Sequence, residues 1–247
     1  MSSSVIEIKT KDGIEPSHFY HPPQGGQRPA VILYMDAFGV RPALCQMAER
    51  LAANGYYVLL PNLYYRSGPA IPFDPATAFE PGPEQQRLKS ARGLINLNNL
   101  MEDTAAMLDF LQRQPGSAGQ KIGCVGYCMG GGMALTAAGT FPDKIAAAAS
   151  FHGARLATDQ PDSPHLLAPK MRAAVYIGIG GLDAHFPAPE KQRLEAALQS
   201  ARVQHTTEVY PNAKHGFAIS DTLGYDKPAS EHHWEQLLKL FAGNLSN

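Results

Sequence analysis

The sequence has few of the features that tie a protein to a membrane, to nucleic acid or to the cell exterior. It holds 3 cysteines among 247 residues, too few for a disulfide framework, which favours a reducing compartment. Its formal net charge is -1 and no basic stripe is visible, so nucleic acid is not an expected partner. No apolar run reaches the roughly 18 residues that a membrane span needs.

Features of a secretion signal are also missing. The first residues, MSSSVIEIKT, lack the charged start and the apolar run of about 7–15 residues that mark a signal peptide. We therefore expect a cytoplasmic protein with no membrane partner. The sequence leaves the oligomeric state open.

The composition is that of a globular protein with a large core. Hydrophobic residues make up 44% of the chain and charged residues 17%. Apolar runs of strand length alternate with helical patterns, which predicts an α/β fold. We expect a doubly wound, mostly parallel sheet with helices on both faces, built as one domain over residues 1–247.

The hydrophobic periodicity places the individual elements. It predicts strands at 30–35, 56–63, 121–128, 173–180 and 205–211, and helices at 41–55, 98–114, 129–142, 188–201 and 230–244. The alanine-rich segment 144–151 has an ambiguous pattern, and its length and position favour a buried strand. Residues 66–83 are rich in proline and glycine, which predicts a lid-like segment.

The stretch VGYCMGGGMA is the most specific part of the chain. Cys128 has Gly126 two residues before it and Gly130 two residues after it, at a predicted strand-to-helix junction. This is the cysteine form of the nucleophile elbow, in which flanking side chains would crowd a sharp turn. The alternative is an inert thiol at a tightly packed, glycine-rich helix start.

A thiol nucleophile needs a base and a group that orients the base. Asp183 follows one predicted strand in GGLDAHFP, and His215 follows the next in PNAKHGFA. Carboxyl ends of parallel strands are where an open α/β sheet places its ligand site. The order nucleophile, acid, histidine is that of α/β-hydrolases.

With these motifs the sequence resembles the dienelactone hydrolase family, the carboxymethylenebutenolidases, within the α/β-hydrolase fold. The segments DAFGV, LPNLYYR, GYCMGG, GGLDAHFPAP and KHGFA carry the resemblance. It implies that Cys128 is the nucleophile, His215 the base and Asp183 the orienting acid. It also implies an oxyanion hole made by the backbone N–H groups of Met129 and Ala37.

The resemblance extends to the substrate, with two departures. It implies that Arg87 binds a substrate carboxylate and that Asp36, where the family has glutamate, contacts the resting thiol. Asp36 is one methylene shorter than that glutamate. Ile219 stands where the family has a second carboxylate-binding arginine. Both departures concern substrate identity rather than the triad.

The remaining candidates have weaker signals. We expect Tyr127, His152 and Ile219 as possible pocket-lining residues and His185 in a rigid loop. Cys45 and Cys124 are expected in the core, and His232 and His233 on the surface. No group of residues has the local spacing of a zinc site and no phosphate loop is present, so neither a metal nor a cofactor is expected.

Three functions fit this pattern. The first is a cofactor-free hydrolase of small lactones or esters that acts through a thioester at Cys128. The second is a thiol redox or peroxide-sensing protein that uses the same sulfur, although no C-x-x-C motif supports it. The third is a binding module on a hydrolase scaffold, without turnover.

Overall fold

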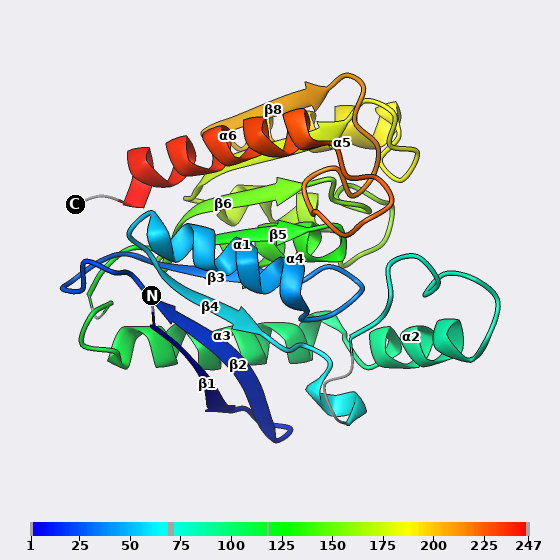
Figure 1. The fold of residues 1–247 in the computed structure, drawn as a ribbon. Coiled ribbons are helices and arrows are strands. Elements are labelled where there is room, and N and C mark those ends of the chain that lie inside the picture. The colour runs from blue at the N-terminus through cyan, green and yellow to red at the C-terminus, as the bar shows by residue number, and fades with distance from the viewer. Residues whose placement is uncertain (1, 69–71, 118, 246–247) are drawn as a thin grey trace. The chain divides into compact units, whose positions relative to one another are not determined.

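The computed structural model describes residues 2–68, 72–117 and 119–245 (Figure 1). Contacts divide the chain into two compact units, Met1–Gln120 and Lys121–Asn247. The expectation of a single domain over the whole chain stays a prediction, and the two units are described separately.

The first unit is a mixed sheet with helices. Its strands lie in the order β1-β2-β4-β3, with β1 antiparallel to β2, β2 antiparallel to β4, and β3 parallel to β4. The strands are β1 (Ser2–Lys9), β2 (Ile14–His21), β3 (Ala30–Tyr34) and β4 (Tyr57–Pro61). The helices are α1 (Pro42–Ala53), α2 (Pro83–Gly93), α3 (Leu97–Arg113) and the short η1 (Tyr65–Ser67).

Strands β1 and β2 were not predicted, because their sequence gives little apolar signal. Most of β1 is exposed, and β2 contains charged and polar residues that include the fully buried Glu15. Burial raises the pKa of Glu15 to about 8, and the Ser17 hydroxyl donates to its carboxyl at 2.8 Å. A buried carboxyl is uncommon in a strand, so pattern rules miss this strand.

The second unit holds four parallel strands in the order β5-β6-β7-β8. They are β5 (Ile122–Tyr127), β6 (Ile145–Phe151), β7 (Ala174–Gly180) and β8 (His205–Tyr210). The helices are α4 (Met129–Thr140), α5 (Ala188–Ser200), α6 (Lys227–Leu245) and the short η2 (Pro164–Lys170). The alanine-rich segment is a strand, as predicted, because β5 and β7 pair with it on both sides.

Two glycines show that helices cover both faces of β5. A Cβ on Gly123 would meet Phe241 and Leu245 of α6, whereas a Cβ on Gly126 would meet the backbone of α4. Residues three apart on a strand point to opposite faces. Helices α6 and α4 therefore cover opposite faces of this strand, in the predicted α/β layering.

The lid-like segment 66–83 is described only in part, because residues 69–71 lie outside the described residues. Its first residues belong to η1, and its last residue begins α2. Between them, the Glu84 carboxylate accepts hydrogen bonds from the Asp74 N–H at 3.0 Å and the Thr77 hydroxyl at 2.8 Å. The segment is therefore anchored to α2, and its action as a lid stays a prediction.

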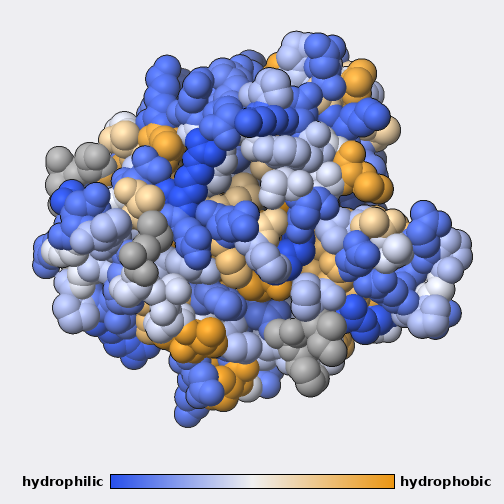
Figure 2. Space-filling view, in the orientation of Figure 1, coloured by the Kyte–Doolittle hydropathy of each residue, from blue (hydrophilic) through white to orange (hydrophobic). Residues whose placement is uncertain are grey.

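The sequence has no apolar run long enough to cross a membrane, and the helices of the structure match this. Within the described ranges, every helix falls short of the length or the apolar composition that a bilayer-crossing helix requires. The face shown in Figure 2 is mostly hydrophilic, with apolar residues in scattered groups.

The contact between β5 and α4 leads to a prediction about stability. A Cβ on Gly126 would lie 1.8 Å from the Gly130 carbonyl oxygen, so Gly126→Ala forces β5 and α4 apart. We expect it to lower the free energy of unfolding by about 3 kcal/mol, at the upper end of overpacking effects. Urea unfolding followed by circular dichroism measures this.

Gly132→Ala on α4 is the matched control. Its Cβ would meet Pro164 at an ordinary 3.7 Å, and alanine is about 1 kcal/mol better than glycine inside a helix. We expect unchanged or higher stability for this variant. Equal stability of the two variants would contradict the tight contact at Gly126.

Candidate active site

Cys128 sits on the strained turn between β5 and α4. Its backbone has φ 54° and ψ -116°, a conformation that non-glycine residues rarely adopt. The Cys128 N–H donates to the Phe151 carbonyl at 3.1 Å, and the Gly131 N–H donates to the Cys128 carbonyl at 3.1 Å. These bonds hold the backbone of the turn, and Cys128 is half-buried rather than buried. The strand-turn-helix context predicted for the elbow is confirmed.

The predicted acid and base lie in contact. Asp183 follows β7 and His215 follows β8, and His215 Nδ1 donates to Asp183 Oδ2 at 2.7 Å. The Asp183 side chain is fully buried, and that of His215 is 23% exposed. An ionised carboxylate only accepts hydrogen bonds, so Nδ1 carries the proton and Nε2 is left for the thiol.

The ring of His215 is polarised from both sides. Burial lowers its pKa, but hydrogen bonds to Asp183 and to the Cys128 thiol outweigh burial and raise the pKa to about 10. Burial raises the pKa of Asp183, but its hydrogen bonds from His215 and His185 bring that pKa below its usual value. An imidazolium beside a thiol favours the thiolate, which is the nucleophilic form.

The other two cysteines lie in different surroundings. Cys124 is buried in β5, as predicted, and its thiol donates to the Ala134 carbonyl at 3.4 Å. Burial raises the pKa of the Cys124 thiol. Cys45 on α1 is half-buried rather than in the core, because it sits beside the buried stripe of that helix.

His152 packs against the base as a neutral ring. It follows β6 with φ 39°, is 1% exposed, and its ring centroid lies 5.2 Å from that of His215. Neither ring nitrogen has a hydrogen-bond partner among the described residues. Burial and then the charge of His215 hold the pKa of His152 well below its usual value.

Tyr127 and Ile219 expose no surface. The Tyr127 hydroxyl pairs with His233 Nε2 at 3.0 Å, so this side chain belongs to the core beneath α6. His233 is fully buried, and its Nδ1 bonds to the Ser230 carbonyl at 2.6 Å. The expectation of a surface position is therefore wrong for His233, because α6 turns this side chain inward.

The two oxyanion-hole candidates lie in different units. Met129 is the first residue of α4, where a backbone N–H has no acceptor inside the helix. Ala37 is buried, and its carbonyl accepts the Tyr64 hydroxyl at 2.9 Å. The hole itself stays a prediction.

In the first unit, Asp36 forms a buried ion pair that the sequence did not reveal. Arg41 donates through its two terminal nitrogens to Oδ1 at 2.7 Å and to Oδ2 at 2.9 Å. The Phe38 N–H also donates to Oδ1, at 3.0 Å. The side chains are 2% and 4% exposed. Asp36 thus has a structural role, and its contact with the thiol stays a prediction.

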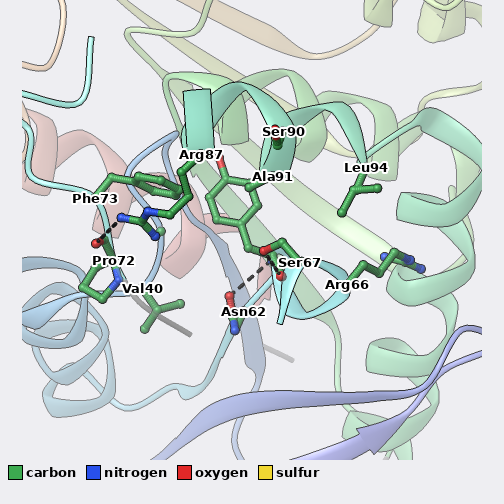
Figure 3. A pocket seen from close by; sticks show the side chains of 12 residues that line it. Val40, Asn62, Arg66, Ser67, Pro72, Phe73, Arg87, Ser90, Ala91 and Leu94 are labelled. Atoms are coloured by element: carbon green, nitrogen blue, oxygen red, sulfur yellow. Dashed lines mark hydrogen bonds between the residues drawn. The ribbon is translucent and has the colours of Figure 1, made fainter. Parts of the chain in front are cut away.

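Arg87 lies in a cavity of about 420 Å³ in the first unit (Figure 3). Its guanidinium lies 3.8 Å from the centroid of the Phe73 ring, donates to the Pro72 carbonyl at 3.3 Å and pairs with Glu84 at 3.7 Å. The described residues that line the cavity include two arginines and no acidic residue.

Asn62 is a lining residue of this cavity that sequence reasoning missed. The side chain is buried, Oδ1 accepts the Tyr64 N–H at 3.2 Å, and Nδ2 has no partner among the described residues. The other lining arginine, Arg66, is neutralised by Asp103 at 2.7 Å. Of the two lining arginines, Arg87 has the longer described ion pair, 3.7 Å to Glu84.

Asp183, His185 and His215 are close enough to share a cation. One ligand atom from each lies within 4.8 Å of the others. A metal here would have to displace the proton between His215 and Asp183, and the raised pKa of His215 opposes that loss. The arrangement suits a proton better than a cation, and the expectation of no metal stays a prediction.

The ion pair at Asp36 leads to a prediction. Breaking a buried pair leaves an uncompensated charge, at a cost of about 3–5 kcal/mol. We expect Asp36→Asn to lower the free energy of unfolding by that amount, measured in urea. Asp159→Asn is the control, because Asp159 pairs with Arg193 at 2.6 Å but is 89% exposed. Such surface pairs contribute about 0–1 kcal/mol, and equal effects of the two variants would refute a structural role for Asp36.

Comparisons with known proteins show which family the chain resembles over its length. The model of the "Dienelactone hydrolase family" matches residues 17–245. The chain is 27% identical over 245 residues to the carboxymethylenebutenolidase of Pseudomonas putida, covering 98% of this chain and 97% of that protein.

Solved structures show the same fold. The chain is similar to a dienelactone hydrolase-like promiscuous phosphotriesterase from metagenomic libraries, with a TM-score of 0.79, 22% identity and 100% of both chains covered. It is also similar to a dienelactone hydrolase from Anabaena variabilis, with a TM-score of 0.72, 20% identity and 99% of both chains covered. The predicted α/β-hydrolase fold is confirmed. With nearly all of its length matched by the family model, the chain belongs to the dienelactone hydrolase family.

Proposed function

We propose that the protein hydrolyses small lactones or esters without a cofactor, through a Cys128–His215–Asp183 triad. The observation that carries the proposal is the 2.7 Å bond between His215 Nδ1 and the buried Asp183, on a ring whose pKa the Cys128 thiol also raises. A nucleophile, its base and the orienting group are thus within reach of one another.

The chemistry follows from these contacts. The Cys128 thiolate attacks the substrate carbonyl carbon, and the carbonyl oxygen takes the negative charge. We assign part of its stabilisation to the Met129 N–H at the start of α4, and the role of the Ala37 N–H stays a prediction. The intermediate collapses to a thioester as the C–O bond breaks, and the His215 imidazolium gives its proton to the leaving oxygen.

Deacylation uses the same ring in reverse. Neutral His215 takes a proton from water, and the hydroxide attacks the thioester carbonyl. The C–S bond then breaks, and the acid product and the thiolate–imidazolium pair result. Asp183 keeps its charge throughout and stabilises the imidazolium.

Arg87 supports a substrate with a carboxylate. Its cavity offers donors and no acidic side chain among the described lining residues. The protein from Pseudomonas putida is named for a lactone substrate, carboxymethylenebutenolide. Ile219 in place of a second arginine leaves one cation fewer for that carboxylate, so we propose a broader substrate range.

The first prediction of this mechanism concerns thiol reactivity and pH. His215 keeps its proton up to its pKa of about 10, and an imidazolium beside a thiol favours the thiolate, so iodoacetamide should label Cys128 faster in the wild type than in a variant without this ring. In His215→Ala the thiol loses this partner, and an ordinary cysteine has a pKa of about 8.5. Labelling of the variant should therefore be at least about tenfold slower at pH 6.5.

These rates are measured by quenching the labelling reaction at timed intervals and analysing the peptides by mass spectrometry. Buried Cys124 serves as the internal control, because it should stay unlabelled. Ester turnover should fall in proportion to the Cys128 modified and vanish in His215→Ala. Activity that survives full modification would refute the triad. If the wild type hydrolyses no ester although Cys128 is labelled, a redox or binding protein would be favoured.

The second prediction concerns substrate charge. A hydrogen bond between Arg87 and a carboxylate contributes about 1.5–3 kcal/mol. Arg87→Ala should therefore lower kcat/KM for an anionic lactone about 10- to 150-fold and leave a neutral lactone of similar size nearly unchanged. Arg92→Ala is the control on the same helix, with an exposed side chain. If Arg87→Ala keeps the full preference for the anion, another cation binds the carboxylate.

A further inference from the structure

Asp183 depends on two histidines for its hydrogen bonds. Its side chain is fully buried, and Oδ2 accepts the His215 Nδ1–H at 2.7 Å. Oδ1 accepts two bonds from His185, from the backbone N–H at 2.8 Å and from Nδ1 at 3.2 Å. Every hydrogen bond that Oδ1 receives from the described residues therefore comes from His185.

The His185 ring also lies against the base. The side chain is 66% exposed, yet its ring centroid is 4.5 Å from that of His215, with the planes at 48°. Holding an exposed ring in one rotamer costs entropy, so its contacts must offset that cost. Those contacts are Asp183 on one side and His215 on the other.

The loop between β7 and α5 holds His185 in this position. The Asp183 N–H donates to the Gly180 carbonyl at 3.1 Å, and the Leu182 N–H donates to the Ala213 carbonyl at 3.0 Å. Phe186, the next residue, is 5% exposed and packs into a hydrophobic cluster. The loop is thus anchored on both sides of His185, and sequence reasoning gave this residue only a place in a rigid loop.

We propose that His185 is a positioning residue for the triad. Its Nδ1–H fixes Asp183 Oδ1, so that Oδ2 stays in line with His215 Nδ1. Because ionised Asp183 only accepts, His185 must carry its proton on Nδ1, and Nε2 is then free to accept from solvent. Its place in catalysis rests on the proposed function, whereas the Asp183–His215 bond that it holds can be measured without turnover.

Three variants separate the ring from its donor. His185→Asn removes the ring but can place a side-chain N–H where Nδ1 lies. His185→Phe keeps a ring against His215 without a donor, and His185→Ala removes both. The backbone N–H to Asp183 persists in all three, so the loss should be partial.

We expect kcat for ester hydrolysis to fall about tenfold in the Phe and Ala variants, with KM nearly unchanged, and to stay within about threefold of the wild type in the Asn variant. The NMR signal of the proton between His215 and Asp183 should weaken or shift in the same two variants. The pKa of His215 should fall with it, because a looser bond stabilises the imidazolium less. The urea unfolding midpoints of the three variants should equal that of the wild type, since the His185 ring is largely exposed.

Wild-type kcat and an unchanged NMR signal in His185→Phe would overturn the proposal. A loss in His185→Asn equal to that in His185→Ala would also overturn it, because the ring would then matter and the donor would not. Cys128→Ala tests the proposed function separately. If that variant still hydrolyses esters, the triad is refuted, while the NMR signal still reports whether His185 holds Asp183.

Discussion

The close approach of β5 and α4 is the constraint on which the second unit depends. The strand enters the turn at Gly126, and there the helix backbone lies where any side chain would be. The turn that follows leaves Cys128 at φ 54° and half-buried. The strain at Cys128 is offset by backbone bonds to β6 and within α4. The parallel strands β7 and β8 then bring Asp183 and His215 to the same edge of the sheet.

The two buried aspartates of this protein show how the choice of partner decides the role of a charge. Asp36 is paired with Arg41, whose guanidinium keeps its proton at any relevant pH, so the pair holds a loop in place. Asp183 is paired with histidine, which can release and accept a proton, and in the proposed mechanism this carboxylate supports proton transfer. The difference lies in the partner, since both carboxylates are buried and both accept hydrogen bonds on each oxygen.

Three histidine rings surround the site in different states. His215 is charged, because Asp183 and Cys128 outweigh its burial. His152 is neutral behind it, because burial and the neighbouring charge both oppose protonation. His185 lies on the exposed side and holds the far oxygen of Asp183. The His215 ring contacts both other rings, which confines its orientation, and the proposed mechanism needs such an oriented ring.

The sequence by itself determined the α/β fold class, most of the strands and helices, and the elbow at Cys128. It did so because glycine spacing and apolar periodicity are local and the carboxyl ends of parallel strands share one edge. It also selected Asp183 and His215, since both follow strands in the order that the family motifs use.

Only the tertiary structure decided which polar groups meet. No local sequence pattern predicts three of these contacts, because side-chain direction and burial decide which groups meet. The three pairs are Arg41 with Asp36, His185 with Asp183 and His233 with Tyr127. The two N-terminal strands escaped prediction for the same reason, as a charged residue such as Glu15 becomes a strand residue only once the neighbouring chain has buried it.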